Sequence, residues 1–362
     1  MNLNKEKILA ELIKACEQGL ISLHNKHEPF KAIVINNDIL TIDLEILNPT
    51  LHFKNKIQKE IKDYLFKKYA NLELICNFLT PPSSKEKSYQ KIKNIIAIAS
   101  GKGGVGKSTI SSNLAVALQK SGHSVGLIDA DIYGPSIPLM FDSEGQKPRL
   151  VDSTPNSLMS PIVSYGVKIM SIGFFSGPNQ ALVWRGPMAT KALKQIITET
   201  DWGDLDYLLI DLPPGTGDIH LSLVQSISIT GAIVITTPQP VSIIDAKKAI
   251  KMFKMDSINV PVLGLIENMS WYLIGDEKKY IFGRDGGKSL SELENVPLLL
   301  ELPLNESIRE AGDVGRPAAL QDTDLGELFQ KLASQVIERT QNRNTSLPKT
   351  KKVKITHNKG CN

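Results

Sequence analysis

Cysteine is scarce in this chain of 362 residues, and the three present, Cys16, Cys76 and Cys361, are far apart. No two of them form a CxxC, which excludes a disulfide framework and a zinc finger built on one local cysteine cluster. No apolar run approaches the roughly 20 residues of a membrane-spanning helix. Residues 1–14 carry five charges before any apolar run forms, unlike a secretory signal. These absences predict a protein of the reducing cytoplasm.

The excess of positive charge is small and unevenly placed. The chain has 42 Lys and Arg against 38 Asp and Glu, a net charge of +4. Residues 341–362 contain six basic residues and no acidic ones, so the other 340 residues carry a net charge of −2. We therefore expect a basic, disordered tail over 341–362, and a body that does not bind nucleic acid through bulk charge.

Hydrophobic residues make up 41% of the chain, enough for a sizeable core, and the length suggests two domains. The first part reads as a small α+β domain over residues 1–79. Its pattern predicts a helix over 5–19, strands over 32–35 and 39–46, a helix over 52–69 and a strand over 72–78. A polar, proline-broken segment over 80–92 has the composition of a linker.

The rhythm changes after residue 92. Short β-branched runs are expected as strands over 95–99, 125–128, 207–210, 232–236 and 262–266. They alternate with helical patterns over 108–120, 189–200, 219–228 and 243–255, and a last helix is expected over 322–340. This alternation predicts an α/β domain over 93–340, whose mostly parallel sheet is covered by helices on both faces.

A phosphate-binding loop follows the first of these strands. The sequence Gly101-Lys-Gly-Gly-Val-Gly-Lys-Ser-Thr109 matches GxxxxGK[ST] between a strand and a helix. Glycines let backbone N–H groups point at phosphate oxygens, and the helix N-terminus adds its positive dipole end. Lys107 is expected on the β- and γ-phosphates and the Ser108 hydroxyl on Mg²⁺. The predicted nucleotide-binding residues are Gly101, Lys102, Gly103, Gly104, Val105, Gly106, Lys107, Ser108 and Thr109.

Carboxylates end two further strands, where ligands collect in open α/β sheets. Asp129 and Asp131 share a face of the extended chain. We expect Asp129 in the outer shell of Mg²⁺ and Asp131 orienting the attacking water, although both carboxylates could instead cap the following turn. Asp211 ends an apolar strand like the Walker B strand and is expected to hold the water shell of Mg²⁺.

The loop after Asp211 reads Leu-Pro-Pro-Gly-Thr-Gly-Asp218 and suits a switch on hydrolysis. Asp218 is equally well interpreted as the N-cap of the next helix. Asn268 ends another strand at the same edge, where its amide can match an adenine edge or simply form a turn.

The second lysine of the loop, Lys102, makes the loop resemble the deviant P-loop of the MinD/ParA and nitrogenase-iron-protein group of dimeric ATPases. That resemblance implies that Lys102 reaches across a dimer interface to the nucleotide of the partner. With Lys107 on the phosphates and Asp131 near the water, Lys102 completes the set of expected catalytic residues.

Several motifs in one order resemble the Mrp/ApbC family of P-loop ATPases, regarded as iron–sulfur cluster carriers. They are DADIYGPS over 129–136, WRGP over 184–187, DLPPGTGD over 211–218, TPQ over 237–239 and ENMS over 267–270. The resemblance runs from about residue 93 to about residue 332. More weakly, residues 1–79 resemble the small domain, related to cytosolic iron–sulfur assembly factors, that often precedes this ATPase.

The chain departs from that family at its cluster site. The family carries a CxxC shortly after the NMS segment, and two such pairs hold a bridging [4Fe–4S] cluster in the dimer. Residues 271–283 contain no cysteine here, so no cluster ligand is assigned. Cys361 is interpreted as a stray tail thiol, with metal binding by a pair of them as the alternative, and Cys16 as a core residue.

We therefore expect a cytoplasmic, homodimeric, Mg²⁺-dependent ATPase of slow turnover that acts in iron–sulfur protein maturation. The resemblance implies ATP, Mg²⁺ and a [4Fe–4S] cluster as cofactors, and apo client proteins and an assembly scaffold as partners. Nucleic acid and membranes are not expected partners. The alternatives are a MinD/ParA-like positioning ATPase that binds membrane or DNA, and a regulatory ATPase that has lost cluster binding.

Overall fold

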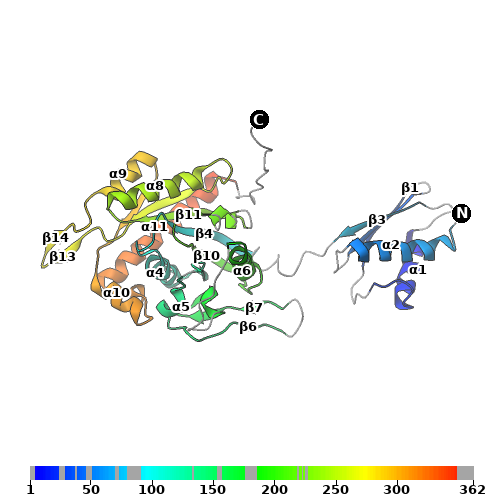
Figure 1. The fold of residues 1–362 in the computed structure, drawn as a ribbon. Coiled ribbons are helices and arrows are strands. Elements are labelled where there is room, and N and C mark those ends of the chain that lie inside the picture. Colours follow the sequence, from blue (N-terminus) through cyan, green and yellow to red (C-terminus); the bar gives the residue numbers. More distant parts are fainter. Residues whose placement is uncertain are drawn as a thin grey trace. The chain divides into compact units, whose positions relative to one another are not determined.

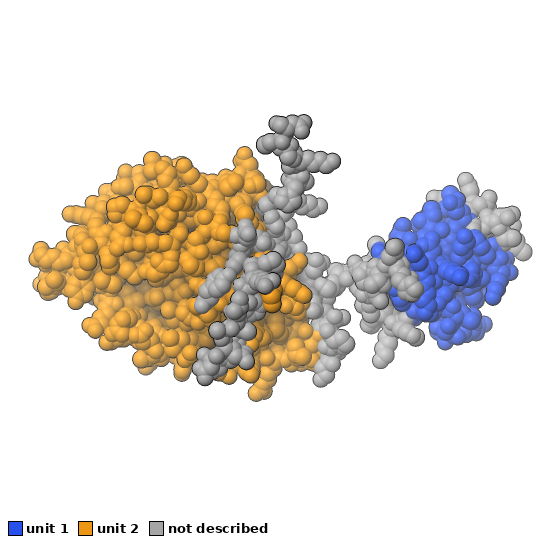
Figure 2. Space-filling model, viewed as in Figure 1, with its two compact units in different colours: residues 1–84 blue, residues 85–362 orange. Residues whose placement is uncertain are grey.

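A computed structural model describes most of the chain. The described residues are 5–23, 29–36, 39–45, 51–69, 73–79, 91–132, 134–152, 157–175, 186–217, 220–221, 223–224 and 227–348. They form two compact units, residues 1–84 and 85–362 (Figure 2). Residues 80–90, most of the expected linker, lie outside the described residues. None of the described helices is both long and apolar enough to span a bilayer.

The first unit is a three-stranded sheet with two helices. Its elements are α1 (Lys5–Glu17), β1 (Phe30–Asn36), β2 (Ile39–Glu45), α2 (Leu51–Phe66) and β3 (Glu73–Leu79). The central strand β2 pairs antiparallel with β1 and parallel with β3. Alternate residues Leu40 and Ile42 of β2 pack against Leu12 of α1 and Ile57 of α2. Cys16 is partly buried against this core, and burial raises the pKa of its thiol to about 11.

The second unit contains an eight-stranded sheet (Figure 1). Its strands, in sheet order, are β15 (Leu298–Glu301), β12 (Val262–Glu267), β11 (Gly231–Thr236), β4 (Ile92–Ser100), β10 (Leu205–Asp211), β5 (Val125–Asp129), β9 (Val167–Ser171) and β8 (Ile162–Ser164). All neighbours pair parallel except β8 and β9. The predicted α/β class with a mostly parallel sheet is confirmed.

Helices cover both faces of this sheet because its strands are apolar on both sides. In β4, Ile96 and Ile98 face one core and Ile95 and Ala97 the other. The first core is covered by α4 (Lys107–Lys120), α5 (Ile137–Met140), α10 (Glu306–Asp313) and α11 (Asp324–Ser346). The second is covered by α6 (Gly186–Thr198), α8 (Pro240–Lys254) and α9 (Gly286–Glu294).

Several short elements have no counterpart in the sequence prediction. They are β6 (Arg149–Leu150), β7 (Met159–Ser160), β8, β9, α5, α9, α10, β15, two 3₁₀ turns (Ile172–Phe174 and Ala318–Leu320) and a hairpin of β13 (Tyr272–Ile274) and β14 (Glu277–Lys279). These runs are too short for a reliable hydrophobic period. The helix expected over 219–228 lies partly outside the described residues, as does Asp218.

The C-terminal helix is longer than predicted. Residues 341–346, expected as the start of a disordered tail, continue α11, so that boundary was wrong. One contact joins the helix end to the sheet: Asn344 Nδ2 donates to Asn94 Oδ1 at 2.8 Å. A second contact is local, because Arg343 Nη2 donates to Pro348 O, just beyond the helix, at 2.8 Å. Residues 349–362, with Cys361, lie outside the described residues.

Candidate nucleotide-binding site

The loop Gly101–Gly106 joins the end of β4 to the start of α4 and depends on its glycines. Gly104 and Gly106 have φ angles of 78° and 82°, in the left-handed region that favours glycine. A Cβ on Gly101 would lie 2.2 Å from the backbone carbonyl carbon of Asp245 in α8. The motif therefore folds as expected, with a tight loop that opens a helix N-terminus.

Asp211 is the polar centre beneath this loop. The Lys107 Nζ lies 2.9 Å from Asp211 Oδ1, and Ser108 Oγ donates to Asp211 Oδ2 at 2.6 Å. The hydroxyl of Ser111 also lies 2.7 Å from Oδ1. Both members of the ion pair are buried, and Lys107 Nζ makes no aligned hydrogen bond to any described residue. The ammonium thus retains donors for an anion such as phosphate.

Asp129 lies beside Asp211 because β5 and β10 are neighbours and the two residues are paired in register. It is fully buried and accepts hydrogen bonds from Ser171 Oγ at 3.0 Å and from Ile137 N at 3.1 Å. Burial and the nearby carboxylate of Asp211 raise the pKa of Asp129 to about 7. The two carboxylates therefore form an acidic pair that favours a cation between or beside them.

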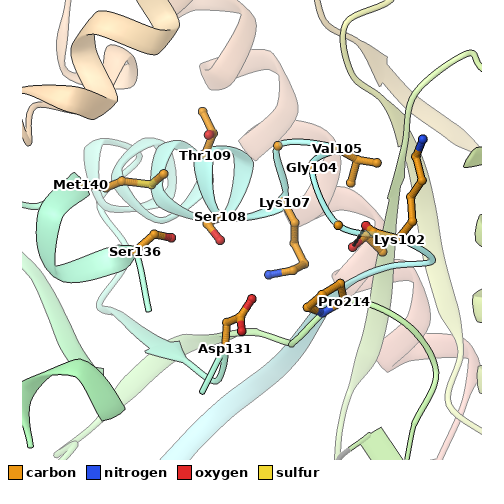
Figure 3. Close-up of a pocket in the computed structure, with 13 residues that line it drawn as sticks. Lys102, Gly104, Val105, Lys107, Ser108, Thr109, Asp131, Ser136, Met140 and Pro214 are labelled. Atoms are coloured by element: carbon orange, nitrogen blue, oxygen red, sulfur yellow. Dashed lines mark hydrogen bonds between the residues drawn. The ribbon is translucent and has the colours of Figure 1, made fainter. Parts of the chain in front are cut away.

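A cavity of about 220 Å³ opens over the loop. Figure 3 shows Lys107, Ser108, Asp131 and Pro214 around it, with Asp131 across from the start of α4. The structure thus brings residues 102–109 of the loop and Asp131 into one cavity, which Gly101 does not line. Pro214 belongs to the segment after Asp211, which is held to β4 where Gly215 N donates to Ser100 O at 3.0 Å.

A second cavity of about 360 Å³ borders the first. The two share Gly106, Thr109 and Met140 in their linings. Asn268 lines the second cavity, and its Nδ2 donates to Val105 O at 2.8 Å. The predicted residue Asn268 therefore touches the phosphate loop and faces the space beside it. Together the cavities offer a polar end and a larger, more apolar end.

Lys102 lines the first cavity, but its ammonium points elsewhere. Its side chain extends away from Lys107 and Asp131 (Figure 3). The Nζ atom donates to Gln239 Oε1 at 3.0 Å. The two lysines of the loop thus point to different places, and only Lys107 lies over the carboxylates.

Sequence reasoning missed four residues of this region. Ser111 is one helical turn from Ser108, a spacing that placed it within reach of Asp211. Ser171 ends β9 and gave no local signal, and Gln239 was part of the TPQ motif without an assigned role. His220 is also buried, and burial, with a smaller effect of the Lys107 charge, lowers its pKa to about 4.

A model of the protein family described as "ParA: NUBPL iron-transfer P-loop NTPase" matches residues 91–337. The chain belongs to this family. The match lies within the second unit and leaves the first unit outside it.

Named relatives agree with this family. An "iron-sulfur cluster carrier protein" of Escherichia coli K12 is 49% identical over 249 residues, which are 68% of this chain and 66% of that protein. The mouse "iron-sulfur cluster transfer protein NUBPL" is 44% identical over 261 residues, 70% of this chain and 80% of that protein. A nucleotide-binding protein of Archaeoglobus fulgidus, solved with ADP, is 34% identical with a TM-score of 0.58, over 68% of this chain and 95% of that one.

The residues present fit magnesium and nucleotide but not a thiolate-bound cluster. Ser108 and Asp211 supply hard oxygen donors next to a buried ammonium, a set suited to Mg²⁺ and phosphate. Among the described residues, no group of three or more His, Cys, Asp or Glu side chains could hold a metal ion by itself. The segment 271–283 forms the hairpin β13–β14 and contains no cysteine.

Proposed function

We propose that this protein is a cytoplasmic, Mg²⁺-dependent ATPase that works as a dimeric nucleotide switch in the maturation of iron–sulfur proteins. The observation that carries the ATPase part is the buried ion pair of Lys107 and Asp211 under the loop Gly101–Gly106, with Ser108 hydrogen-bonded to Asp211. Membership of a P-loop NTPase family supports the nucleotide, and the names of the bacterial and mouse relatives support the iron–sulfur role.

The chain's own groups divide the work of binding and hydrolysis. Backbone N–H groups of the loop bind phosphate oxygens, and Lys107 leaves Asp211 to neutralise the β- and γ-phosphates. Asp211, released from that pair, would hold the water shell of Mg²⁺ together with its neighbour Asp129. Ser108 would hold the metal directly, and Asp131 orients the attacking water. Bound Mg²⁺ supplies charge neutralisation across the phosphates.

The adenosine part of the nucleotide belongs in the second cavity. This cavity shares lining residues with the phosphate cavity, and Asn268 offers a donor and an acceptor for the adenine edge. Binding there requires Asn268 to exchange or share its hydrogen bond to Val105 O. Asn268→Ala should weaken ATP binding without affecting binding of inorganic triphosphate.

Lys102 acts in a dimer. Its ammonium points away from Lys107, and we infer that it contacts the phosphates bound by a second copy. Lys102→Ala should then spare ATP binding and abolish hydrolysis. Turnover is expected to be slow, because the switch between two states rather than a product is the output.

Iron–sulfur clusters enter as cargo and not as a resident group. Oxygen and backbone groups are poor substitutes for thiolates on a soft cluster, and the hairpin β13–β14 offers no cysteine. An apo client or an assembly scaffold would therefore have to supply the thiolates. No step of the proposed ATPase reaction depends on a cluster.

A second candidate, a regulatory ATPase that has lost cluster binding, is favoured by the same missing cysteines. Anaerobic reconstitution with iron and sulfide separates the two, with iron and sulfide counted per dimer in the wild type and in Cys361→Ser. A stoichiometric cluster in the presence of a client favours assembly, and none in any mixture favours regulation.

A third candidate, a positioning ATPase, depends on the basic segment 341–362. Salt-sensitive binding to liposomes or DNA that disappears when residues 349–362 are deleted would favour it. The deletion begins after Pro348, so that the hydrogen bond from Arg343 to Pro348 O is preserved.

The decisive test of the ATPase assignment is Lys107→Ala in an ATP titration by calorimetry. The variant should lose measurable ATP binding, because the loop then lacks its only buried ammonium among the described residues. Lys248→Ala, an exposed lysine of α8 paired with Asp245, is the matched control and should bind ATP like the wild type. Undiminished affinity in Lys107→Ala would refute the assignment.

A further inference from the structure

The side chain of Lys102 is hydrogen-bonded to Gln239, the residue just before α8. Its Nζ donates to Gln239 Oε1 at 3.0 Å, across 137 residues of sequence. The hydroxyl of Thr237 donates to the same amide oxygen at 3.3 Å. One oxygen thus receives a cation and a hydroxyl at once, and the second contact fixes the amide in the orientation that accepts from the lysine.

The turn that carries Gln239 is itself well ordered by other groups. Thr237 N donates to Ser242 Oγ at 3.1 Å, and Ser242 Oγ lies 2.9 Å from Thr236 Oγ1. Gln239 occupies the N-cap position of α8, but its side chain makes no capping hydrogen bond. The amide of Gln239 is therefore not needed to start the helix, and its hydrogen bonds serve Thr237 and Lys102.

We propose that Gln239 is a positioning residue that holds Lys102 away from phosphate until a second copy of the chain binds. We call the contact of Lys102, Gln239 and Thr237 the lysine latch. The proposal rests on the proposed function, in which Lys102 contacts the phosphates of the partner. The latch must open for that contact, so it opposes assembly of the ATP-bound dimer.

A closed latch opposes dimerisation because the ammonium of Lys102 cannot contact Gln239 and the phosphates of the partner at the same time. In the free chain, Lys102 is half-buried and hydrogen-bonded, so it has already lost part of its hydration. Moving it to a partner's phosphates costs the bond to Gln239. A hydrogen bond to a charged group at such a half-buried site changes an equilibrium by about three- to tenfold.

Two substitutions at one position give opposite predictions. Gln239→Leu removes the acceptor and keeps the size of the side chain, so the dissociation constant of the ATP-bound dimer should fall about three- to tenfold. Gln239→Glu replaces the amide with a carboxylate and makes an ion pair, so that constant should rise by a similar factor. Sedimentation of the full chain with Mg²⁺ and a non-hydrolysable ATP analogue measures both.

The two Gln239 substitutions are also made in the Lys102→Ala protein, to test whether they act on dimerisation through Lys102. In Lys102→Ala, both Gln239 substitutions should leave dimerisation unchanged, because the latch no longer has its cation. ATP affinity of the separate chains should be equal in the wild type and in the two Gln239 variants, since Gln239 lines neither of the two cavities. A merely structural role for Gln239 would instead lower dimerisation in both variants, with or without Lys102.

The outcomes separate the latch from the function on which it rests. If the wild type neither binds ATP nor dimerises with it, the proposed function fails and the latch fails with it. If the wild type dimerises with ATP, but the two Gln239 variants are neutral or shift it in the same direction, only the latch is overturned. Opposite shifts that disappear in Lys102→Ala support it.

Discussion

The ion pair of Lys107 and Asp211 gives a quantitative prediction for the nucleotide-free protein. Lys107 is 7% exposed and Asp211 fully buried, so removing one partner leaves a buried charge without compensation. Asp211→Asn keeps the size of the side chain and strands the ammonium of Lys107. Removing one partner of a buried pair costs about 3–5 kcal/mol, and we expect the free energy of unfolding to fall by that amount.

Lys107→Met should lower the free energy of unfolding by less than Asp211→Asn does. Without the ammonium, Asp211 retains the hydroxyls of Ser108 and Ser111, at 2.6 and 2.7 Å. Asp129 beside it, with its raised pKa, also takes up a proton readily and limits the repulsion between the carboxylates. We expect a loss of about 1–3 kcal/mol, since the remaining charge is still hydrogen-bonded.

The double variant Lys107→Met/Asp211→Asn decides whether this reasoning holds. Replacing both members of a buried pair by uncharged groups is often nearly neutral. The second substitution should therefore restore stability to Asp211→Asn, with a coupling energy of about 2 kcal/mol or more. If the losses of stability of the two single variants simply add in the double variant, the reasoning is refuted.

The assay is urea unfolding of nucleotide-free protein followed by tryptophan fluorescence. All three tryptophans, Trp184, Trp202 and Trp271, lie in residues 85–362, so the signal reports only the second unit. Trp202 is fully buried, and its Nε1 donates to Ile197 O at 3.1 Å. Its emission should shift strongly on unfolding. The slope against urea should be equal in the four proteins, which checks that all of them unfold to the same extent.

Two further predictions concern the loop and the pH dependence of stability. Gly101→Ala should lower the free energy of unfolding by about 1–3 kcal/mol and weaken ATP binding, because the new Cβ would meet the backbone of α8. A Cβ on Gly104 would meet nothing within 4 Å, so Gly104→Ala should cost only about 1 kcal/mol of backbone strain. Thermal unfolding and ATP titration of the two variants test this difference. Hydrogen bonds from Lys93 and from Ser124 lower the pKa of Asp206 from 3.8 to about 2. Solvent screening at this partly exposed site reduces its stabilising contribution to about 1 kcal/mol. That contribution is complete above about pH 5 and is lost as the pH falls toward 2, so Asp206→Asn should flatten this part of a stability profile measured by urea unfolding.

The phosphate loop and its carboxylates were predictable because each depends on a short stretch of chain. The motif at Gly101–Ser108 needs only a strand before it and a helix after it, and both neighbours have strong patterns. Asp129 and Asp211 end apolar strands, and parallel strands bring their carboxyl ends to one edge. Their meeting in space therefore followed from the fold class, while their roles in hydrolysis remain a prediction.

Other parts of the site depend on contacts that no short segment encodes. Gln239 meets Lys102 only because β11 lies next to β4 in the sheet, an order that the strand patterns do not reveal. The short strand β15, four residues long, lacks a readable period. The extension of α11 to Ser346 likewise depends on the distant contact of Asn344 with Asn94. Tertiary contacts override local propensity in these places.

The hairpin β13–β14 remains tied to the nucleotide site although it has no cysteine. At its start, Asn268 contacts the phosphate loop through Val105 O. After its end, Gly286 lies so close to Pro238 that a Cβ would approach the proline carbonyl oxygen to 2.6 Å. Pro238 lies between Thr237 and Gln239, the two residues of the lysine latch on that turn. A change at the phosphate loop or the lysine latch thus has a contiguous path of packed groups to this hairpin. The absence of cysteine from the hairpin leaves these contacts in place, so the proposed nucleotide switch does not require cluster ligands there.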